Sequence, residues 1–161
     1  MYPIRTCSNI FLKKEVKILE VTFFGHRDAP PSIKPALEKT IRYLINSQNA
    51  TVFYVGNNGN FDLFVADILH KLTSEFSQIE YYIVLAYMPQ KSNMIQQVYL
   101  PHTLYPESVA NGIPKFAISR RNEWMLQKSD LVVTYITHSY GGAKKYQNKA
   151  LQAGKKVINI T

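Results

Sequence analysis

The sequence has very little cysteine and no long hydrophobic run. Cys7 is the single cysteine in a chain of 161 residues, so no disulfide can form within the chain. No run of 18 or more apolar residues is present to form a membrane-spanning helix. Residues 1–15 lack an apolar core followed by a small-residue cleavage site, and so do not predict a signal peptide. From these absences we expect a cytoplasmic protein with no membrane partner.

The motifs of several enzyme classes are also missing. The chain contains neither GxxxxGK[ST] nor a full GxGxxG, which argues against nucleoside-triphosphate hydrolysis and ordinary nicotinamide binding. It contains no GxSxG, and Cys7 precedes the first expected strand with no evident base partner. The four histidines form no i,i+4 pair and there is no cysteine cluster, so we expect no metal site and no cofactor.

Acidic residues are scarce relative to basic ones. The 19 Lys and Arg residues against 11 Asp and Glu residues give a formal net charge of +8, which favours anionic partners such as nucleic acid or phosphorylated small molecules. The basic residues are dispersed in pairs, and no run of five or more indicates a nucleic-acid-binding arm. A solvated basic surface is the alternative interpretation.

The chain does contain a regular alternation of short β-rich runs and helical stretches. This alternation predicts crossover connections and a mainly parallel sheet. We therefore expect an α/β fold, a three-layer Rossmann-like domain with a five-stranded, mainly parallel sheet of order 3-2-1-4-5. An α+β fold with mixed strand pairing is the alternative. The expected strands are 16–24, 51–55, 80–87, 130–136 and 156–160, and the expected helices are 32–47, 61–76, 116–128 and 142–153.

The domain organisation is simple. An apolar content of 46% indicates a folded chain, and the length fits one domain. We expect residues 1–15 to be an N-terminal extension and residues 16–161 to form the single domain. Residues 88–114 hold four of the eight prolines and no clear period, but also Tyr99 and Tyr105, which argue against full disorder. We interpret this segment as a functional loop that could close over a ligand as a lid.

Polar residues and glycines gather where the expected strands end. Parallel sheets bind ligands outside the carboxyl ends of their strands, where the strand order reverses, so these residues predict a ligand pocket. The opposite edge of the sheet has plainer loops. The predicted ligand-binding residues are Gly25, His26, Arg27, Gly56, Asn57, Asn58, Gly59, Asp62, Ser119, Arg120, Arg121, Asn122, Thr137, His138, Ser139, Gly141, Gly142 and Ala143.

Three features of this set indicate particular chemistry. Arg120 and Arg121 fall in the first turn of a helix, where cations oppose the helix dipole, so an anion or an acidic side chain is expected to hold them. The glycine pair at 141–142 opens a helix directly after a strand, which suits close approach of a phosphate. Asp62 either caps its helix or binds ribose hydroxyls, and both interpretations remain open. His26 and His138 could contact a phosphate or move a proton.

Four stretches together resemble a small bacterial branch of the SLOG superfamily. They are VTFFGHRD at 21–28, FYVGNNGNFD at 53–62, FAISRRN at 116–122 and VTYITHSYGGA at 133–143. That superfamily joins the DNA-processing protein of natural transformation with the "lonely guy" phosphoribohydrolases. The resemblance covers about residues 16–160 and implies a Rossmann-like fold with a nucleotide-derived ligand at the carboxyl edge. It also implies a homodimer as an option, because relatives of this fold often pair through helices.

The resemblance to the phosphoribohydrolases breaks down at their catalytic motif. Those enzymes carry Pro-Gly-Gly-x-Gly-Thr-x-x-Glu after the corresponding strand. Gly141 and Gly142 match its glycine pair, lysines 144 and 145 stand in place of the next Gly and Thr, and we assign Gln147 to the catalytic glutamate. A neutral Gln cannot act as a carboxylate does, which counts against hydrolysis. The catalytic residue is therefore unknown, with Asp62, Asp28 and Glu107 as candidate carboxylates.

The function predicted first is binding or sensing of a nucleotide-derived, phosphate-bearing small ligand at the carboxyl edge of the sheet. The second hypothesis is a nucleotide N-glycoside hydrolase. The third is single-stranded DNA binding, which we rank lower because the basic residues are dispersed.

Overall fold

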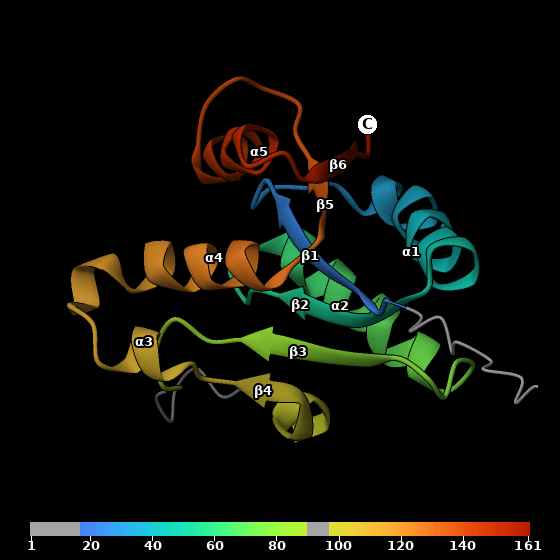
Figure 1. Ribbon diagram of the computed structural model, residues 1–161, viewed down its shortest axis with the longest axis horizontal. Helices are drawn as coiled ribbons and strands as arrows, with labels where there is room; N and C mark the ends of the chain where they lie inside the picture. The colour runs from blue at the N-terminus through green and yellow to red at the C-terminus, as the bar shows by residue number, and fades with distance from the viewer. Residues whose placement is uncertain (1–16, 90–96) are drawn as a thin grey trace, which may run out of the picture.

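A six-stranded, entirely parallel sheet forms the centre of the computed structural model, which describes residues 17–89 and 97–161. The strands are β1 (Leu19–Gly25), β2 (Ala50–Val55), β3 (Glu80–Val84), β4 (Thr103–Leu104), β5 (Leu131–Tyr135) and β6 (Lys156–Asn159). Their order in space is β4-β3-β2-β1-β5-β6 (Figure 1). The direction of winding therefore reverses between β1 and β5.

The predicted fold class is confirmed, with one correction. The five expected strands take the predicted relative order, but β4 adds a sixth beyond β3 at the edge of the sheet. Only two residues long, β4 shows no detectable period of its own, and Pro101 and Pro106 lie close on either side of it. Prolines are tolerated at such an edge because no further strand needs their missing N–H groups.

Helices cover both faces of the sheet. They are α1 (Lys34–Gln48), α2 (Asn60–Thr73), the one-turn α3 (Glu107–Ala110), α4 (Ala117–Lys128) and α5 (Gly142–Gln152). The apolar sides of α1 and α2 pack against one face of the sheet, while those of α4 and α5 pack against the other (Figure 1). Among the described residues, no helix is long and apolar enough to cross a membrane.

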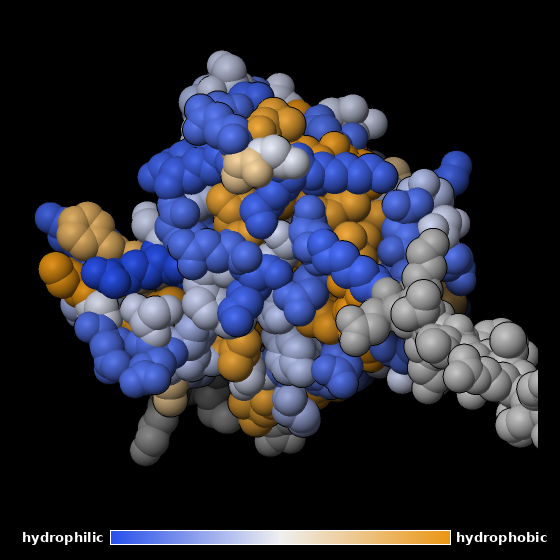
Figure 2. Space-filling view, viewed as in Figure 1, coloured by the Kyte–Doolittle hydropathy of each residue, from blue (hydrophilic) through white to orange (hydrophobic). Residues whose placement is uncertain are grey.

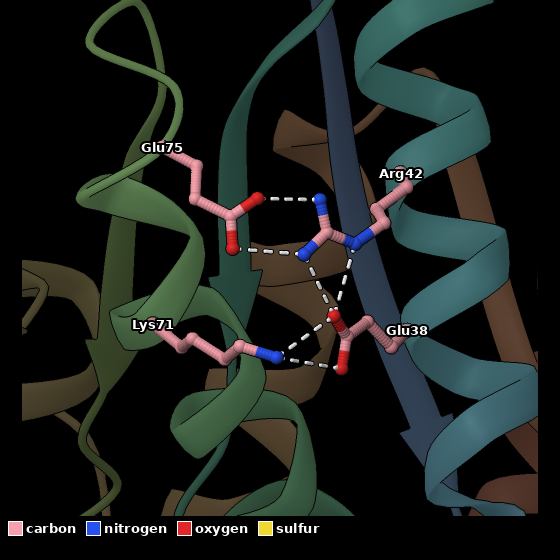
Figure 3. Close-up of polar contacts among 4 residues, drawn as sticks. All are labelled: Glu38, Arg42, Lys71 and Glu75. Atoms are coloured by element: carbon pink, nitrogen blue, oxygen red, sulfur yellow. Dashed lines mark hydrogen bonds and ion pairs between the residues drawn. The ribbon is translucent and has the colours of Figure 1, made fainter.

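Four charged side chains join the outer surfaces of α1 and α2 (Figure 3). Arg42 on α1 donates two hydrogen bonds to Glu75, at 2.6 and 2.9 Å, and also pairs with Glu38 one turn earlier. Lys71 on α2 contacts Glu38 at 3.1 Å. These bonds lower the pKa of both Glu38 and Glu75 below their usual range, Arg42 being the largest cause in each case. The network bridges α1 and the end of α2, and none of its four residues belongs to the stretches that predict the pocket.

The segment 88–114, expected to be a long loop, contains two short helices and a strand. Residues 90–96, like the predicted extension 1–15, lie outside the described residues. From Gln97 onward the chain forms a 3-10 helix, β4 and α3. The Tyr99 hydroxyl donates to Asp67 on α2, and Leu85 N–H donates to Leu104 O at 2.8 Å. The described part is thus docked on α2 and the edge of the sheet, and its role as a lid remains a prediction.

Candidate functional site

A cavity of about 380 Å³ opens at the carboxyl ends of β1 and β5, where the winding of the sheet reverses. The end of β1 lies between α4 and α5 (Figure 1), and both helices supply residues to the cavity wall. Open α/β sheets bind ligands at this position. The lining residues are Phe23, Phe24, Gly25, His26, Arg27, Asp28, Asn58, Asp62, Ile118, Arg121, Asn122, Met125, His138, Gly141, Gly142 and Ala143.

The cavity gathers residues from all four predicted stretches. The loop after β1 contributes all of its members, from Gly25 to Asp28. From the loop after β2, Asn58 and Asp62 line this cavity, whereas Gly56, Asn57 and Gly59 line a smaller one of about 150 Å³ that also touches Asp62. The loop between β1 and α1 is fixed to the start of α2, because Asn60 N–H donates to Arg27 O at 2.8 Å.

The two adjacent arginines face different cavities. Arg121 and Asn122 line the 380 Å³ cavity, while Ser119 and Arg120 line a separate groove of about 410 Å³ beside Trp124. Successive residues on a helix point about 100° apart, so Arg120 and Arg121 leave α4 in different directions. The helix begins at Ala117, which puts Arg121 at the start of the second turn rather than in the predicted first.

The loop after β5 is likewise divided. His138, Gly141, Gly142 and Ala143 line the cavity, whereas the exposed side chains of Thr137 and Ser139 do not. Thr137 acts instead through its backbone, whose N–H donates to His26 Nε2 at 3.1 Å. This bond ties the loop after β5 to the loop after β1.

The Arg121 guanidinium is buried against the cavity and bonded to neutral oxygens. It donates to Asn57 Oδ1 at 3.1 Å, Asn58 Oδ1 at 3.0 Å, Asn122 Oδ1 at 2.8 Å and Val84 O at 3.3 Å. The side chain is 3% exposed, and burial lowers the pKa of Arg121, although an arginine remains charged in proteins. These contacts hold the planar group in place but supply no full negative charge to it.

Asp62 is the acidic group nearest to this arginine. Its Oδ2 accepts a hydrogen bond from Asn58 N–H at 2.9 Å. Burial raises the pKa of the Asp62 carboxyl to about 6, an effect that the positive charges of Arg121 and Arg27 only partly oppose. The carboxyl therefore titrates close to neutral pH and can accept hydrogen bonds or release a proton there.

We expect the Asp62→Asn variant to be more stable than the wild type at pH 8. The folded-state pKa lies above the ordinary value of 3.8, so the folded protein holds the proton more tightly than the unfolded chain. Stability from this group is therefore lost as the pH rises through about 6. Two pKa units correspond to at most about 3 kcal/mol. Urea unfolding of both proteins at pH 4.5 and pH 8 measures the effect, and a difference that is the same at both values would contradict it.

The first turn of α5 presents backbone donors to the cavity. The N-cap residue, Gly141, has no side chain that could cap the helix. The first helical bond runs from Lys145 N–H to Gly141 O. The N–H groups of residues 142–144 precede that bond and have no partner within the helix. Gly141 has a φ of +94°, which favours glycine. This arrangement can bind a negatively charged group.

Gln147 is held away from the cavity. Its Nε2 donates to Thr134 Oγ1 at 3.0 Å and its Oε1 accepts from Lys144 Nζ at 2.7 Å. Counting the phosphoribohydrolase motif from Gly141 also places the glutamate position at Asn148, so the assignment to Gln147 is wrong by one residue. Neither residue is a carboxylate, and Gln147 braces α5 against β5.

The other two candidate carboxylates, Asp28 and Glu107, differ in whether they line the cavity. Asp28 lies at the cavity, where its charge raises the pKa of His26 against the larger, lowering effects of burial and of His138. Glu107 lies on α3, is not among the cavity residues, and accepts from the Asn111 side chain at 3.5 Å. No group of three or more His, Cys, Asp or Glu residues in the described ranges is arranged to hold a metal ion.

The sequence did not identify the apolar part of the cavity. Phe23, Phe24, Ile118 and Met125 line it beside the polar groups. Ile118 and Met125 lie seven residues apart on α4 and therefore share a face with Arg121. That spacing is the signal that could have found them.

Comparison with known proteins agrees with this architecture. No curated protein matches the chain. The DNA processing protein A of Streptococcus pneumoniae has a similar structure, with a TM-score of 0.65 and 20% identity; the match covers 89% of this chain and 50% of that one. A structure titled for the single-stranded DNA binding mode of DNA processing protein A from Helicobacter pylori gives a TM-score of 0.63 and 17% identity, covering 88% of this chain and 64% of that one.

At these identities the likenesses show the fold alone, and this chain spans only half to two thirds of those proteins. The sequence model of the YspA SLOG family matches residues 16–160, which is nearly the whole chain. The chain therefore belongs to the YspA SLOG family.

Proposed function

We propose that the protein binds a nucleotide-derived, phosphate-bearing small ligand in the 380 Å³ cavity. The observation that carries this proposal is the buried guanidinium of Arg121, whose hydrogen-bond acceptors in the described structure are neutral amide and carbonyl oxygens. A fixed, planar cation at a cavity wall is suited to recognise a phosphate or carboxylate. The cavity volume also falls within the range of small-molecule sites.

The other polar groups at the cavity suit two parts of a nucleotide: the donors suit the phosphate and the acceptors suit the sugar. The free N–H groups at the start of α5 and the exposed Arg27 suit phosphate oxygens. Asp62 and Asn58 offer oxygen acceptors suited to ribose hydroxyls. With Asp62 titrating near pH 6, an incoming anion raises the pKa of that carboxyl further, so binding is expected to be coupled to proton uptake at neutral pH.

Isothermal titration calorimetry tests the proposal directly. The purified chain is titrated with the four common nucleoside monophosphates, two nucleotide sugars and inorganic phosphate at pH 7. We expect at least one nucleotide derivative to bind with a dissociation constant in the micromolar range. A folded protein that binds none of them would overturn the proposal.

Single-stranded DNA binding is the second candidate. It is favoured by the net charge of +8 and by the structural similarity to a protein whose structure is titled for its single-stranded DNA binding mode. The face seen in Figure 2 is largely hydrophilic, with apolar side chains exposed in patches between the polar ones. Binding of a fluorescent oligonucleotide at 50 and 200 mM salt separates the two functions, because phosphate-backbone contacts weaken steeply with salt.

Nucleotide N-glycoside hydrolysis has a narrower basis. The supporting feature is a pair of carboxylates at the cavity, of which Asp62 has a raised pKa. Release of free base from nucleoside monophosphates, compared between wild type and Asp62→Asn, tests this function.

Homodimer formation and a cytoplasmic location also remain proposals, and light scattering in solution would test the first.

A further inference from the structure

Three aromatic rings form a continuous stack at the edge of the cavity. The His26 and His138 rings lie 3.6 Å apart between centroids and 17° from parallel, and the Tyr140 ring stacks on His138 at 3.9 Å and 24°. His26 and His138 line the cavity, and Tyr140 lies in sequence between His138 and the lining residue Gly141. The stack therefore runs from the buried end of β1 outward to the surface.

The inner end of the stack is anchored. His26 is buried and its Nε2 accepts the hydrogen bond from Thr137 N–H, so this ring is neutral with its proton on Nδ1. The Tyr135 ring contacts His26 edge-on at 6.2 Å. Burial and the neighbouring His138 lower the pKa of His26, which keeps the inner ring uncharged at neutral pH.

The middle ring is held by stacking rather than by polar bonds. His138 Nδ1 is buried and has no hydrogen-bond partner among the described residues. One face of the His138 ring contacts His26 and the other contacts Tyr140, so the three rings form one stack.

The outer ring is unusually open. Tyr140 is 71% exposed, the most open of the large hydrophobic side chains in the described part of the chain. By comparison, Tyr43 and Tyr87 are each 48% exposed and bond through their hydroxyls, Tyr43 with Gln48 and Tyr87 with Pro114 O. One face of the Tyr140 ring is covered by His138, which leaves the other free for a planar partner.

We propose that the free face of Tyr140 stacks on the aromatic base of the ligand, so that the site selects intact nucleoside monophosphates over sugar phosphates and free phosphate. This inference rests on the proposed function and adds the substrate class. A base stacks readily on any aromatic ring, and Tyr140, already stacked on His138 through one face, has its other face open for that contact. Tyr140 is adjacent to the glycine pair that opens α5, so the base would lie beside the group that binds the phosphate.

Calorimetry with matched probes tests the assignment. The wild type, Tyr140→Leu and Tyr140→Phe are titrated with the tightest-binding nucleoside monophosphate, with ribose 5-phosphate and with inorganic phosphate. Loss of one base stack is expected to weaken binding of the monophosphate about 5- to 150-fold in Tyr140→Leu. We expect Tyr140→Phe to bind as the wild type does and ribose 5-phosphate to bind equally to all three proteins. The control Tyr43→Leu removes an exposed tyrosine on α1 and is expected to change nothing.

A fluorescent variant gives an independent readout. The chain has one tryptophan, Trp124, which lines the separate groove on α4. In Tyr140→Trp, the new indole is expected to retain binding and to be quenched by the monophosphate but not by ribose 5-phosphate. Unaltered fluorescence at a saturating monophosphate concentration would overturn the stack.

The outcomes separate the two proposals. If the wild type binds no monophosphate, both fail. If it binds one and Tyr140→Leu binds equally well, the base stack is wrong and the proposed function stands. If Tyr140→Leu weakens ribose 5-phosphate as much as the monophosphate, the ring supports the loop rather than the base, and the inference is overturned. If Tyr140→Leu weakened binding of an oligonucleotide but not of the monophosphate, the stack would belong to single-stranded DNA binding. The inference would then be overturned as well.

Discussion

Replacement of Arg121 by methionine is expected to weaken nucleotide binding by about 10- to 150-fold, the range for loss of a hydrogen bond to a charged group. Methionine keeps much of the apolar stem but removes the cation from the cavity wall. The change also leaves the side-chain oxygens of Asn57 and Asn58 without their donor, so we expect a stability loss of about 1–3 kcal/mol. Arg121→Lys retains the charge without the planar fork, and is expected to bind with intermediate affinity.

Arg120 provides the matched control for this prediction. It is the same residue type on the same helix, but it is exposed and lines the groove beside Trp124. We expect Arg120→Met to change nucleotide affinity less than twofold and stability by less than about 0.5 kcal/mol. Calorimetry and urea unfolding of the three variants give both quantities. Equal losses of affinity from the two methionine variants would mean that general surface charge, and not the buried guanidinium, binds the ligand.

The fold could be predicted because alternation of strands and helices leaves few arrangements of a parallel sheet. The errors arose where burial and strand structure differ. Residues 85–87 continue the apolar run of β3 and were expected to extend that strand, but it ends at Val84. Leu85 and Ala86 are nevertheless buried, Ala86 against Val109 and Ala117. An apolar run therefore marks burial, while the end of the strand depends on partners that only the folded chain supplies.

The candidate site was predicted by location more accurately than by side chain. All four stretches meet at one edge because the carboxyl ends of parallel strands share it. Which of two adjacent arginines points inward depends on where α4 begins, and a shift of one residue changes the answer by about 100°. The stack on Tyr140 was not predicted, since His26 and His138 are more than a hundred residues apart and nothing local indicates that their rings touch.

The second large effect is expected from Gly56→Ala, because this glycine makes room for the two charged groups of the site. A Cβ at position 56 would lie 2.7 Å from Asp62 Oδ2 and 2.8 Å from an Arg121 guanidinium nitrogen. Both groups are hydrogen-bonded and cannot move without breaking those bonds. We expect a stability loss of about 1–3 kcal/mol from overpacking, together with loss of nucleotide binding.

Gly112→Ala offers a closely matched comparison, because a Cβ at position 112 would lie 2.6 Å from the side chain of Arg120. That arginine is exposed and can swing into solvent, so the same steric overlap is expected to cost less than about 0.5 kcal/mol and to leave binding intact. Urea unfolding and calorimetry on both variants decide the matter. If Gly56→Ala bound nucleotide as the wild type does, the positions of Asp62 and Arg121 would be irrelevant to the ligand. The cavity at the carboxyl ends of β1 and β5 would then have to bind it through the first turn of α5 and Arg27 alone.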